Sequence, residues 1–371
     1  MRQPFYVGLA AVAVALGFQA LTVRYNYGGD WTALFCVGDR FAQPPELTRP
    51  YRFRESWGYD GQSCRLIAHD PFLGRGFHRY LDNPRHRYSR ILVPAIAWAV
   101  GLGQDRFVDT AYIATIAGWI FAGTYWLALL SHRFGYSPTW GLLFVMAPAT
   151  LVGIDRLTVD VALAALCVAF VVLRPGSAGW LLALAAAALC RETGFLLIAA
   201  GCFSFLRERR LTTALITAAT GLPALIWILW TRAHLPASHT SWTGVIPLAG
   251  YFTRLLHSFA YLLSPALATI AQLLDYAALA GVAIALACLV KLRKSPELWA
   301  CVLPVLFVSL ADVWTEVYAF GRTMSPFWLL IAMRGVEARL WIALAPIALM
   351  DLRIGWQLGA QVLGIVKGLV T

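Results

Sequence analysis

The chain has 371 residues, of which 60% are hydrophobic and 13% are charged, and its formal net charge is +11. A soluble domain of this length could not bury so much apolar surface, so the composition predicts a multi-pass helical membrane protein. The basic residues lie at the ends of apolar segments and in one long loop. This distribution excludes nucleic acid and favours membrane lipids or a phosphate-bearing substrate as partners.

The first apolar segment, residues 5–23, is followed by Arg24 with no small-residue cleavage site before it. We therefore expect a retained first transmembrane helix. Residues 24–90 then form the only large polar loop in the N-terminal half. Within this loop, residues 63–68 are expected to form a short surface helix that ends before Pro71.

Residues 91–103 are apolar, but about 13 residues at about 1.5 Å each are too short to cross about 30 Å of hydrocarbon. We expect an interfacial or re-entrant helix there, so the long external loop carries juxtamembrane helices. Ten further apolar segments, several of them short, bring the expected number of transmembrane helices to about ten or eleven: residues 109–130, 139–153, 161–173, 180–190, 195–206, 211–230, 270–290, 298–310, 327–333 and 340–350.

Basic residues between the apolar segments indicate the orientation. If residues 91–103 do not cross, four basic clusters share the side of the N-terminus and are cytoplasmic by the positive-inside rule: residues 131–134, 174–177, 207–210 and 291–294. The opposite face then carries the external loops 24–90 and 231–269 and the polar turns 153–160, 190–194 and 312–325. We expect one transmembrane module over residues 1–335 and a C-terminal helical segment, residues 336–371, whose side the sequence does not define.

Two of these turns hold acids and arginines at the membrane edge: Asp155, Arg156 and Asp160 in one, and Arg191 and Glu192 in the other. A charge at a helix centre costs about 2.5 to 3.5 kcal/mol on insertion scales, so such residues indicate a function. Because the flanking helices are short, we expect the turns to sink into the membrane and line a polar cavity that opens outward. The alternative is structural: neighbouring charges neutralise each other, and Asp160 caps the helix that follows it.

Six motifs carry a resemblance to a known family: residues 59–62 (YDGQ), 69–72 (HDPF), 87–94 (RYSRILVP), 154–160 (IDRLTVD), 191–194 (RETG) and 321–326 (GRTMSP). Together with the expected topology, they make the chain resemble the GT-C fold integral membrane glycosyltransferases over residues 1–335, and a bacterial branch of that superfamily in particular. The resemblance implies an all-α, GT-C-like fold in the bacterial inner (cytoplasmic) membrane, with the active site on the extracytoplasmic side.

The resemblance also implies transfer of a sugar from a polyprenyl-phosphate-linked donor to an acceptor, which could be a glycan, a lipid or a protein. The paired-acid and acid-aromatic signatures of other branches are missing from the loop of residues 24–90. The identity of the sugar and of the acceptor therefore stays open.

Inverting glycosyl transfer needs a carboxylate that takes a proton from the acceptor hydroxyl. Asp60 is the preferred general base, because Gly58 and Gly61 permit a tight turn around it. Gln62 follows, and its amide can bond a sugar hydroxyl. The alternative is a turn aspartate that bonds its own backbone.

Further residues are expected to complete the site. Arg322 is the preferred phosphate ligand, because it lies on the external side and a guanidinium makes bidentate bonds to phosphate. The other candidates are the catalytic carboxylates Asp155 and Asp160 and the substrate-binding residues Asp70, Arg87, Arg90, Arg191 and Glu192. Asp70 precedes a proline and has a structural role as its alternative. We expect Asp60 and Asp160 to approach each other across the cavity mouth, with Arg322 or Arg191 nearby.

The cysteines and histidines show no metal-ligand spacing, so we expect no metal and no other cofactor. A divalent metal held by Asp60, Asp155 and Asp160 is an alternative, because some relatives of this kind use one. Cys36 and Cys64 form the only pair considered for a disulfide, and free thiols are the alternative.

A lipid or small-molecule transporter or flippase is the rival function, because charged membrane residues suit it as well. Against it, the sequence shows no internal repeat and no matched pair of Gly- or Pro-broken helices, and its acids gather on one face. A catalytically silent scaffold on a GT-C-like fold is the third interpretation, since a fold does not confer activity.

Overall fold

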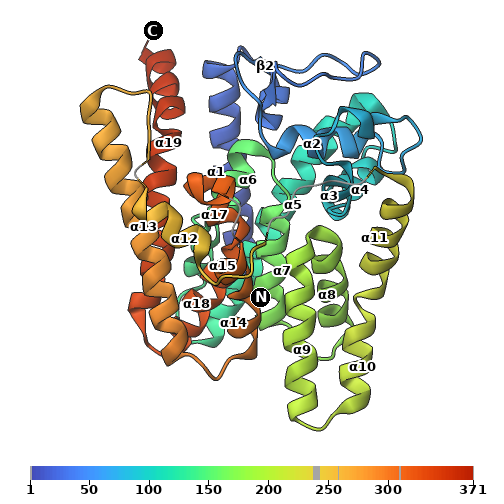
Figure 1. Cartoon of the computed structure of the whole chain (residues 1–371), viewed down its shortest axis with the longest axis vertical. Helices are drawn as coiled ribbons and strands as arrows, with labels where there is room; N and C mark the ends of the chain where they lie inside the picture. The colour runs from blue at the N-terminus through green and yellow to red at the C-terminus, as the bar shows by residue number, and fades with distance from the viewer. Residues whose placement is uncertain (1, 237–242, 258, 309–310, 371) are drawn as a thin grey trace.

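The computed structural model describes residues 2–236, 243–257, 259–308 and 311–370, and its secondary structure is almost entirely helical (Figure 1). The expected all-α architecture is therefore confirmed. Two strands of two residues each, β1 (Val37–Gly38) and β2 (Arg52–Phe53), form a parallel pair in the long polar loop.

Helices follow one another along the described chain. The first half contains α1 (Arg2–Asn26), η1 (Trp31–Phe35), α2 (Asp60–His69), η2 (Phe77–Tyr80), α3 (Pro84–Tyr88), α4 (Leu92–Val100), α5 (Asp105–Arg133), η3 (Pro138–Phe144), α6 (Pro148–Arg156), α7 (Asp160–Val172) and α8 (Ala178–Cys190). The second half contains η4 (Glu192–Gly194), α9 (Phe195–Arg207), α10 (Leu211–Ala219), α11 (Leu222–His234), α12 (Ala249–Leu256), α13 (Pro265–Lys291), α14 (Pro296–Cys301), α15 (Leu303–Phe307), α16 (Ala311–Thr315), α17 (Val317–Thr323), α18 (Ser325–Glu337), η5 (Trp341–Leu344) and α19 (Ala345–Val370).

Four helical stretches among the described residues are long and apolar enough to cross a membrane: α1, α5, Leu211–His234 (α10 with α11) and α13. A fifth is added if η3 and α6, which meet at a bend of 60°, count as one span. This number is smaller than the expected ten or eleven. Several expected spans fold as short helices, and a helix of 13 residues such as α7 or α8 falls below the roughly 20 residues that a crossing needs.

Helix α7 shows that protein can cover an apolar segment of the length of a shortened span. Eleven of its 13 residues are buried inside the protein. It packs against α5, α6, α8 and α18, so protein rather than lipid covers its apolar surface. An apolar run of this length is typical of a buried core helix as well as of a shortened span.

The polar loop and the basic connections lie at opposite ends of the molecule (Figure 1). Helices α2 and α3 and strand β2 lie at the upper end, which we call the loop end. The α9–α10 and α13–α14 connections lie at the lower end. Arg133, at the end of α5, donates a hydrogen bond to the Val172 carbonyl at the end of α7, which places two further basic clusters side by side.

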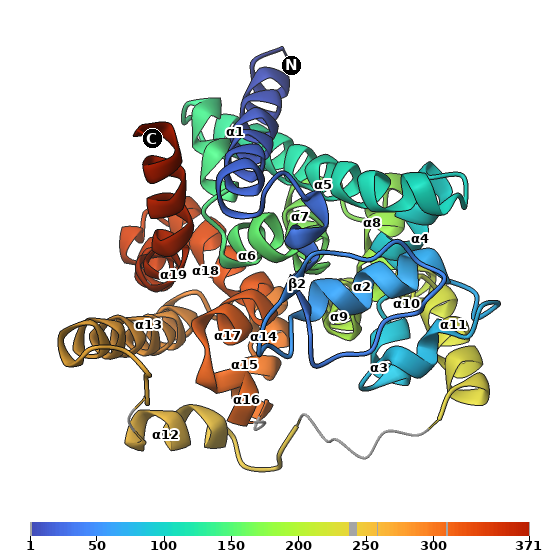
Figure 2. The ribbon, with the colours of Figure 1, turned by 90° about the horizontal axis from the view of Figure 1, so that it is seen from above.

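The C-terminal helix α19 packs lengthwise against α13 and also contacts α1. Seen from above (Figure 2), α13 and α19 lie on one side of the molecule and α2, α3 and α11 on the other. Near the loop end, the Asn26 side chain donates to the Gln361 carbonyl at 3.1 Å. The last residues of the chain are thus in contact with the end of the first helix.

The first turn of α2 is fixed against the end of α6 by a glycine. A Cβ atom on Gly61 would lie 2.3 Å from the carbonyl oxygen of Arg156 and 2.8 Å from that of Phe35, so no larger residue fits without movement. Gly58, just before the helix, has a φ of +72°, a conformation that favours glycine. The helix expected over residues 63–68 is present and starts earlier, at Asp60, but residues 61–69 are all buried, so it is not the surface helix that was expected.

Candidate functional site

Seven charged residues from five segments meet beneath the loop end. We call them the arginine–carboxylate cluster: Asp60 (α2), Arg87 (α3), Arg90, Asp160 (α7), Arg191, Glu192 (η4) and Arg322 (α17). All seven are candidates from the sequence. Their side chains are linked by ion pairs into one connected group.

Arg322 lies at the centre of the cluster and joins the two aspartates. Its Nη2 donates to Asp60 Oδ2 at 2.6 Å, and its Nη1 donates to Asp160 Oδ2 at 2.6 Å. Its Nε donates to the Tyr59 hydroxyl at 3.1 Å, and the guanidinium carbon lies 4.9 Å from the centre of the Tyr59 ring. The predicted approach of Asp60 to Asp160 beside Arg322 is therefore confirmed, and their roles stay predictions.

Asp60 is also bound from the side of α3. Arg87 Nη1 donates to Asp60 Oδ1 at 2.5 Å, and Arg90 Nη1 lies 3.9 Å from Asp60 Oδ2. Burial raises the pKa of the Asp60 carboxyl, but Arg322, Arg87 and Arg90 outweigh it and hold the pKa well below its usual range. Asp60 is thus an ionised carboxylate whose two oxygens are both taken by guanidinium groups.

Arg191 and Arg90 form the other half of the cluster. Arg191 is paired with Asp160 through Nη1, and its Nη2 donates to the Thr323 hydroxyl at 3.2 Å. Its Nε is buried and has no hydrogen-bond partner among the described residues, although Glu192 Oε1 lies 3.5 Å away. Arg90 donates to both oxygens of Glu192, at 3.2 and 2.8 Å.

His86 is held neutral at the edge of the cluster. Arg90 Nη2 lies 2.6 Å from His86 Nε2, so this ring nitrogen accepts the hydrogen bond. Burial, reinforced by Arg90, lowers the pKa of His86 to about 3. Burial raises the pKa of Glu192, but Arg90 and Arg191 outweigh it and leave that pKa below its usual range. The carboxylates near His86 are therefore ionised while the imidazole is uncharged.

The cluster is closed and electrically balanced in this structure. The four guanidinium groups of the cluster carry four positive charges. They face the carboxylates of Asp60, Asp160 and Glu192 and that of Asp82, which binds Arg87 Nη2 at 2.8 Å. Four positive charges therefore meet four negative ones. The cavity between Asp60, Thr158 and the arginines has a volume of about 10 Å³, which is room for about one water molecule. The buried Thr158 hydroxyl has no partner in the described part of the chain.

Guanidinium groups that converge on acceptor oxygens form a site for a phosphate or a phosphodiester. Asp60 and Asp160 hold Arg322 in place of such an anion, and an incoming phosphate would have to displace at least one of these carboxylates. An anion bound in this way would leave a released carboxylate next to it.

Three residues that were predicted for the site lie outside the cluster: Asp155, Gln62 and Asp70. The Asp155 carboxylate is buried and is bound by Arg156 at 2.9 Å, by the Tyr318 hydroxyl at 3.2 Å and by Gln361 at 2.6 Å. Gln62 accepts from the Gly38 N–H at 3.2 Å and donates to the Trp57 carbonyl at 2.8 Å. Both ends of its amide therefore hold the loop.

Asp70 also has a structural position. Its two carboxylate oxygens each accept a backbone N–H at 3.1 Å, one from Arg75 and one from Phe77, and the residue is buried. The structure thus favours the structural alternative that its following proline indicated.

Four residues beside the cluster were missed by the sequence reasoning: Tyr59, Thr158, His86 and Thr323. Tyr59, Thr158 and Thr323 stand inside the motifs YDGQ, IDRLTVD and GRTMSP, within two positions of a candidate residue, and this position was an available signal. His86 immediately precedes Arg87 but had no pattern that set it apart from the other histidines.

The sequence left a disulfide and a divalent metal as alternatives. All seven cysteines are free, so the pairing of Cys36 with Cys64 is not formed, and Cys36 Sγ accepts from Arg156 at 2.6 Å. Within the described residues, no group of three or more His, Cys, Asp or Glu side chains is arranged to hold a metal ion.

No family model, no curated protein and no solved structure matches the chain.

Proposed function

We propose that the chain is a membrane glycosyltransferase that moves a sugar from a polyprenyl-phosphate carrier to an acceptor hydroxyl on the extracytoplasmic face. One observation carries the proposal. Arg87, Arg90, Arg191 and Arg322 come from distant parts of the sequence and converge on Asp60, Asp160 and Glu192 in an apolar helical protein. Such a concentration of charge is costly beside a membrane and is a functional site by default.

In the proposed reaction, the donor phosphate takes the place of a carboxylate on Arg322 and Arg87. The bond from the sugar C1 to the phosphate oxygen breaks, and its electron pair stays on the phosphate. Negative charge therefore grows on that group in the transition state, and guanidinium groups already aimed at it stabilise this charge. Arg191, which is held by Asp160 and Thr323, would contribute to the stabilisation of the same charge.

Asp60 is the proposed general base. When Arg322 and Arg87 turn to the phosphate, the Asp60 carboxylate loses the partners that hold its pKa low, and it becomes a better proton acceptor. The acceptor oxygen then bonds to C1 on the face opposite the phosphate, and its proton moves to Asp60. Donor binding and base activation are thereby coupled, because the same arginines serve the phosphate and restrain the base.

Two substitutions separate these roles. Purified protein in lipid bilayers is incubated with a panel of polyprenyl-phosphate hexoses and pentoses, and both donor binding and loss of the lipid-linked sugar are followed. Asp60→Asn keeps the shape and loses the proton acceptor, so we expect retained donor binding and a fall in transfer of about 10²- to 10⁴-fold. Arg322→Ala should weaken donor binding as well.

Arg210→Ala is the matched control for removal of a guanidinium, because Arg210 is about half exposed and lies in the α9–α10 connection at the opposite end. We expect it to behave as the wild type. Full turnover by Asp60→Asn contradicts the base assignment. If the wild type binds no donor of the panel, the transferase proposal fails, and a transporter or a silent scaffold is favoured instead.

A further inference from the structure

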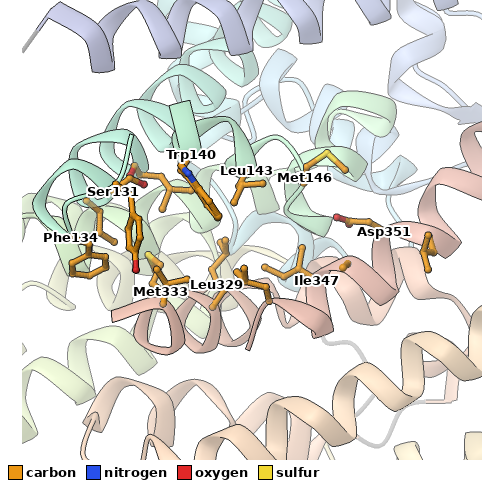
Figure 3. Close-up of a pocket in the computed structure, with 17 residues that line it drawn as sticks. Ser131, Phe134, Trp140, Leu143, Met146, Leu329, Met333, Ile347 and Asp351 are labelled. Carbon is orange, nitrogen blue, oxygen red and sulfur yellow. The ribbon is translucent and has the colours of Figure 1, made fainter. Parts of the chain in front are cut away.

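An apolar pocket of about 430 Å³ shares no residue with the arginine–carboxylate cluster. It is enclosed by the end of α5, by η3, by α18 and by the start of α19 (Figure 3). Its walls are almost entirely hydrocarbon and include Leu143, Leu329, Met333 and Ile347. A volume of this size lies in the range of small-molecule sites.

Asp351 is the only residue with a formal charge in the lining of this pocket. Its side chain points from α19 toward the pocket, near Met146 (Figure 3). The Oδ1 atom is buried and has no hydrogen-bond partner in the described part of the chain. No cation of the described residues lies within ion-pair distance of Asp351, whereas Arg353, two residues further, is already paired with Asp275 at 2.8 Å.

A carboxylate without a partner is unfavourable at the wall of an apolar pocket, because burial removes water without supplying a donor. No side chain among the described residues supplies this donor. The Ser131 hydroxyl, another polar group of the lining, already donates to the Leu127 carbonyl at 2.9 Å. The shape and the charge of the site are therefore complementary to a ligand with a hydrocarbon body and one cationic hydrogen-bond donor.

We propose that this pocket binds a lipid-soluble amine, with a single hydrocarbon chain along the apolar walls and its ammonium group on Asp351 Oδ1. The chain packs against Leu329 and Met333, and the ammonium supplies the hydrogen bond that Oδ1 lacks. The site is independent of the transferase proposal.

Photolabelling in bilayers tests the proposal. The full chain, reconstituted in lipid, is irradiated with an alkylamine that carries a diazirine in its chain, and labelled peptides are identified by mass spectrometry. Labels are expected on η3 and α18. Dodecylamine should compete at about tenfold lower mole fraction in the membrane than dodecanoate or dodecanol, because only the ammonium makes a charge-assisted hydrogen bond to the carboxylate.

Three variants make the test specific. Asp351→Asn should remove the preference for the amine over the acid and the alcohol. Ala348→Trp should fill the pocket and reduce labelling of η3 and α18 by the probe. Glu337→Gln, which removes a half-exposed carboxylate at the end of α18 outside the lining, should keep the preference unchanged. A thermal unfolding curve of each variant shows that it is folded.

Three results overturn the proposal. Equal competition by dodecylamine, dodecanoate and dodecanol in the wild type would show that the pocket takes any chain. Labelling that avoids η3 and α18, or an amine preference that survives Asp351→Asn in folded protein, would show that the amine binds elsewhere.

Discussion

Two aspartates in the same loop show how the immediate surroundings of a residue decide its use. Asp70 stands after the last turn of α2, where free backbone N–H groups of Arg75 and Phe77 satisfy its oxygens. Asp60 stands in the first turn, and both of its oxygens are taken by arginine side chains instead. Asp70 is therefore fixed to the backbone. Asp60 is bound by arginine side chains, which in the proposed function exchange it for another anion.

We expect His86 to make the protein sensitive to mild acid. Its pKa is lowered to about 3 in the folded state, against about 6.5 in an unfolded chain. Between these values the unfolded state binds more protons, so the stabilising contribution is complete above about pH 6.5 and is lost as the pH falls toward 3. We predict that the melting temperature of the wild type falls between pH 7 and pH 5 by more than that of His86→Gln.

Glutamine is the suitable replacement because its carbonyl oxygen can still accept from Arg90 and does not titrate. The window above pH 5 also lies above the usual pKa of aspartate and glutamate, so the carboxylates of the cluster contribute little there. Parallel melting profiles of the two proteins would show that His86 carries no proton linkage.

At the scale of elements, α2 is attached to α5 by a second set of charges. Arg65 is 1% exposed and binds Asp109 through Nε and Nη2, both at 2.8 Å. His69 lies between two carboxylates, with Nδ1 2.8 Å from Asp105 and Nε2 3.0 Å from Asp109. These contacts connect the helix that carries Asp60 to the longest helix of the module.

Removal of one partner from this attachment should cost more than removal of both. Asp109→Leu leaves the buried guanidinium of Arg65 without its carboxylate, and breaking a buried pair typically costs about 3 to 5 kcal/mol. The double variant Arg65→Met with Asp109→Leu replaces the pair by apolar side chains, which is often close to neutral. We predict a higher melting temperature for the double variant than for Asp109→Leu alone. The reverse order would mean that Arg65 stabilises the protein even without its carboxylate, through contacts such as its hydrogen bond to the Thr48 carbonyl.

At the scale of the whole molecule, the polar loop and the basic connections occupy opposite ends (Figure 1). If the chain spans the membrane as the positive-inside rule predicts, the two ends face different compartments. We predict that cysteines placed at Ser89, after α3, and at Ser295, before α14, react with impermeant reagents from opposite sides. Six of the native cysteines are buried, so only Cys202 needs prior replacement. Labelling of both positions from one side would contradict the predicted orientation.

The charged site was more predictable from the sequence than the helices around it. Charges in an apolar chain are rare and costly, so Asp60, Asp160 and Arg322 stood out and their meeting could be expected. The number of spans could not be predicted, because an apolar run of 13 residues has the same sequence pattern whether lipid or protein covers it, as α7 shows. The partners of Gln62 and Asp155 depend on tertiary contacts that no local pattern encodes.

In the proposed function, the nearly filled cavity of about 10 Å³ between the arginines means that carboxylates of the protein compete with the donor phosphate. Asp60 and Glu192 are tethered beside the guanidinium groups, so their effective concentration there exceeds that of any dilute anion in the surrounding water. In the proposed function, a soluble sugar phosphate loses this competition. A polyprenyl-linked donor is instead concentrated in the membrane by its chain, at about 0.8 kcal/mol for each buried CH₂ group. The internal carboxylates would thus allow membrane-anchored phosphates to bind the arginines and would prevent free phosphates from binding them.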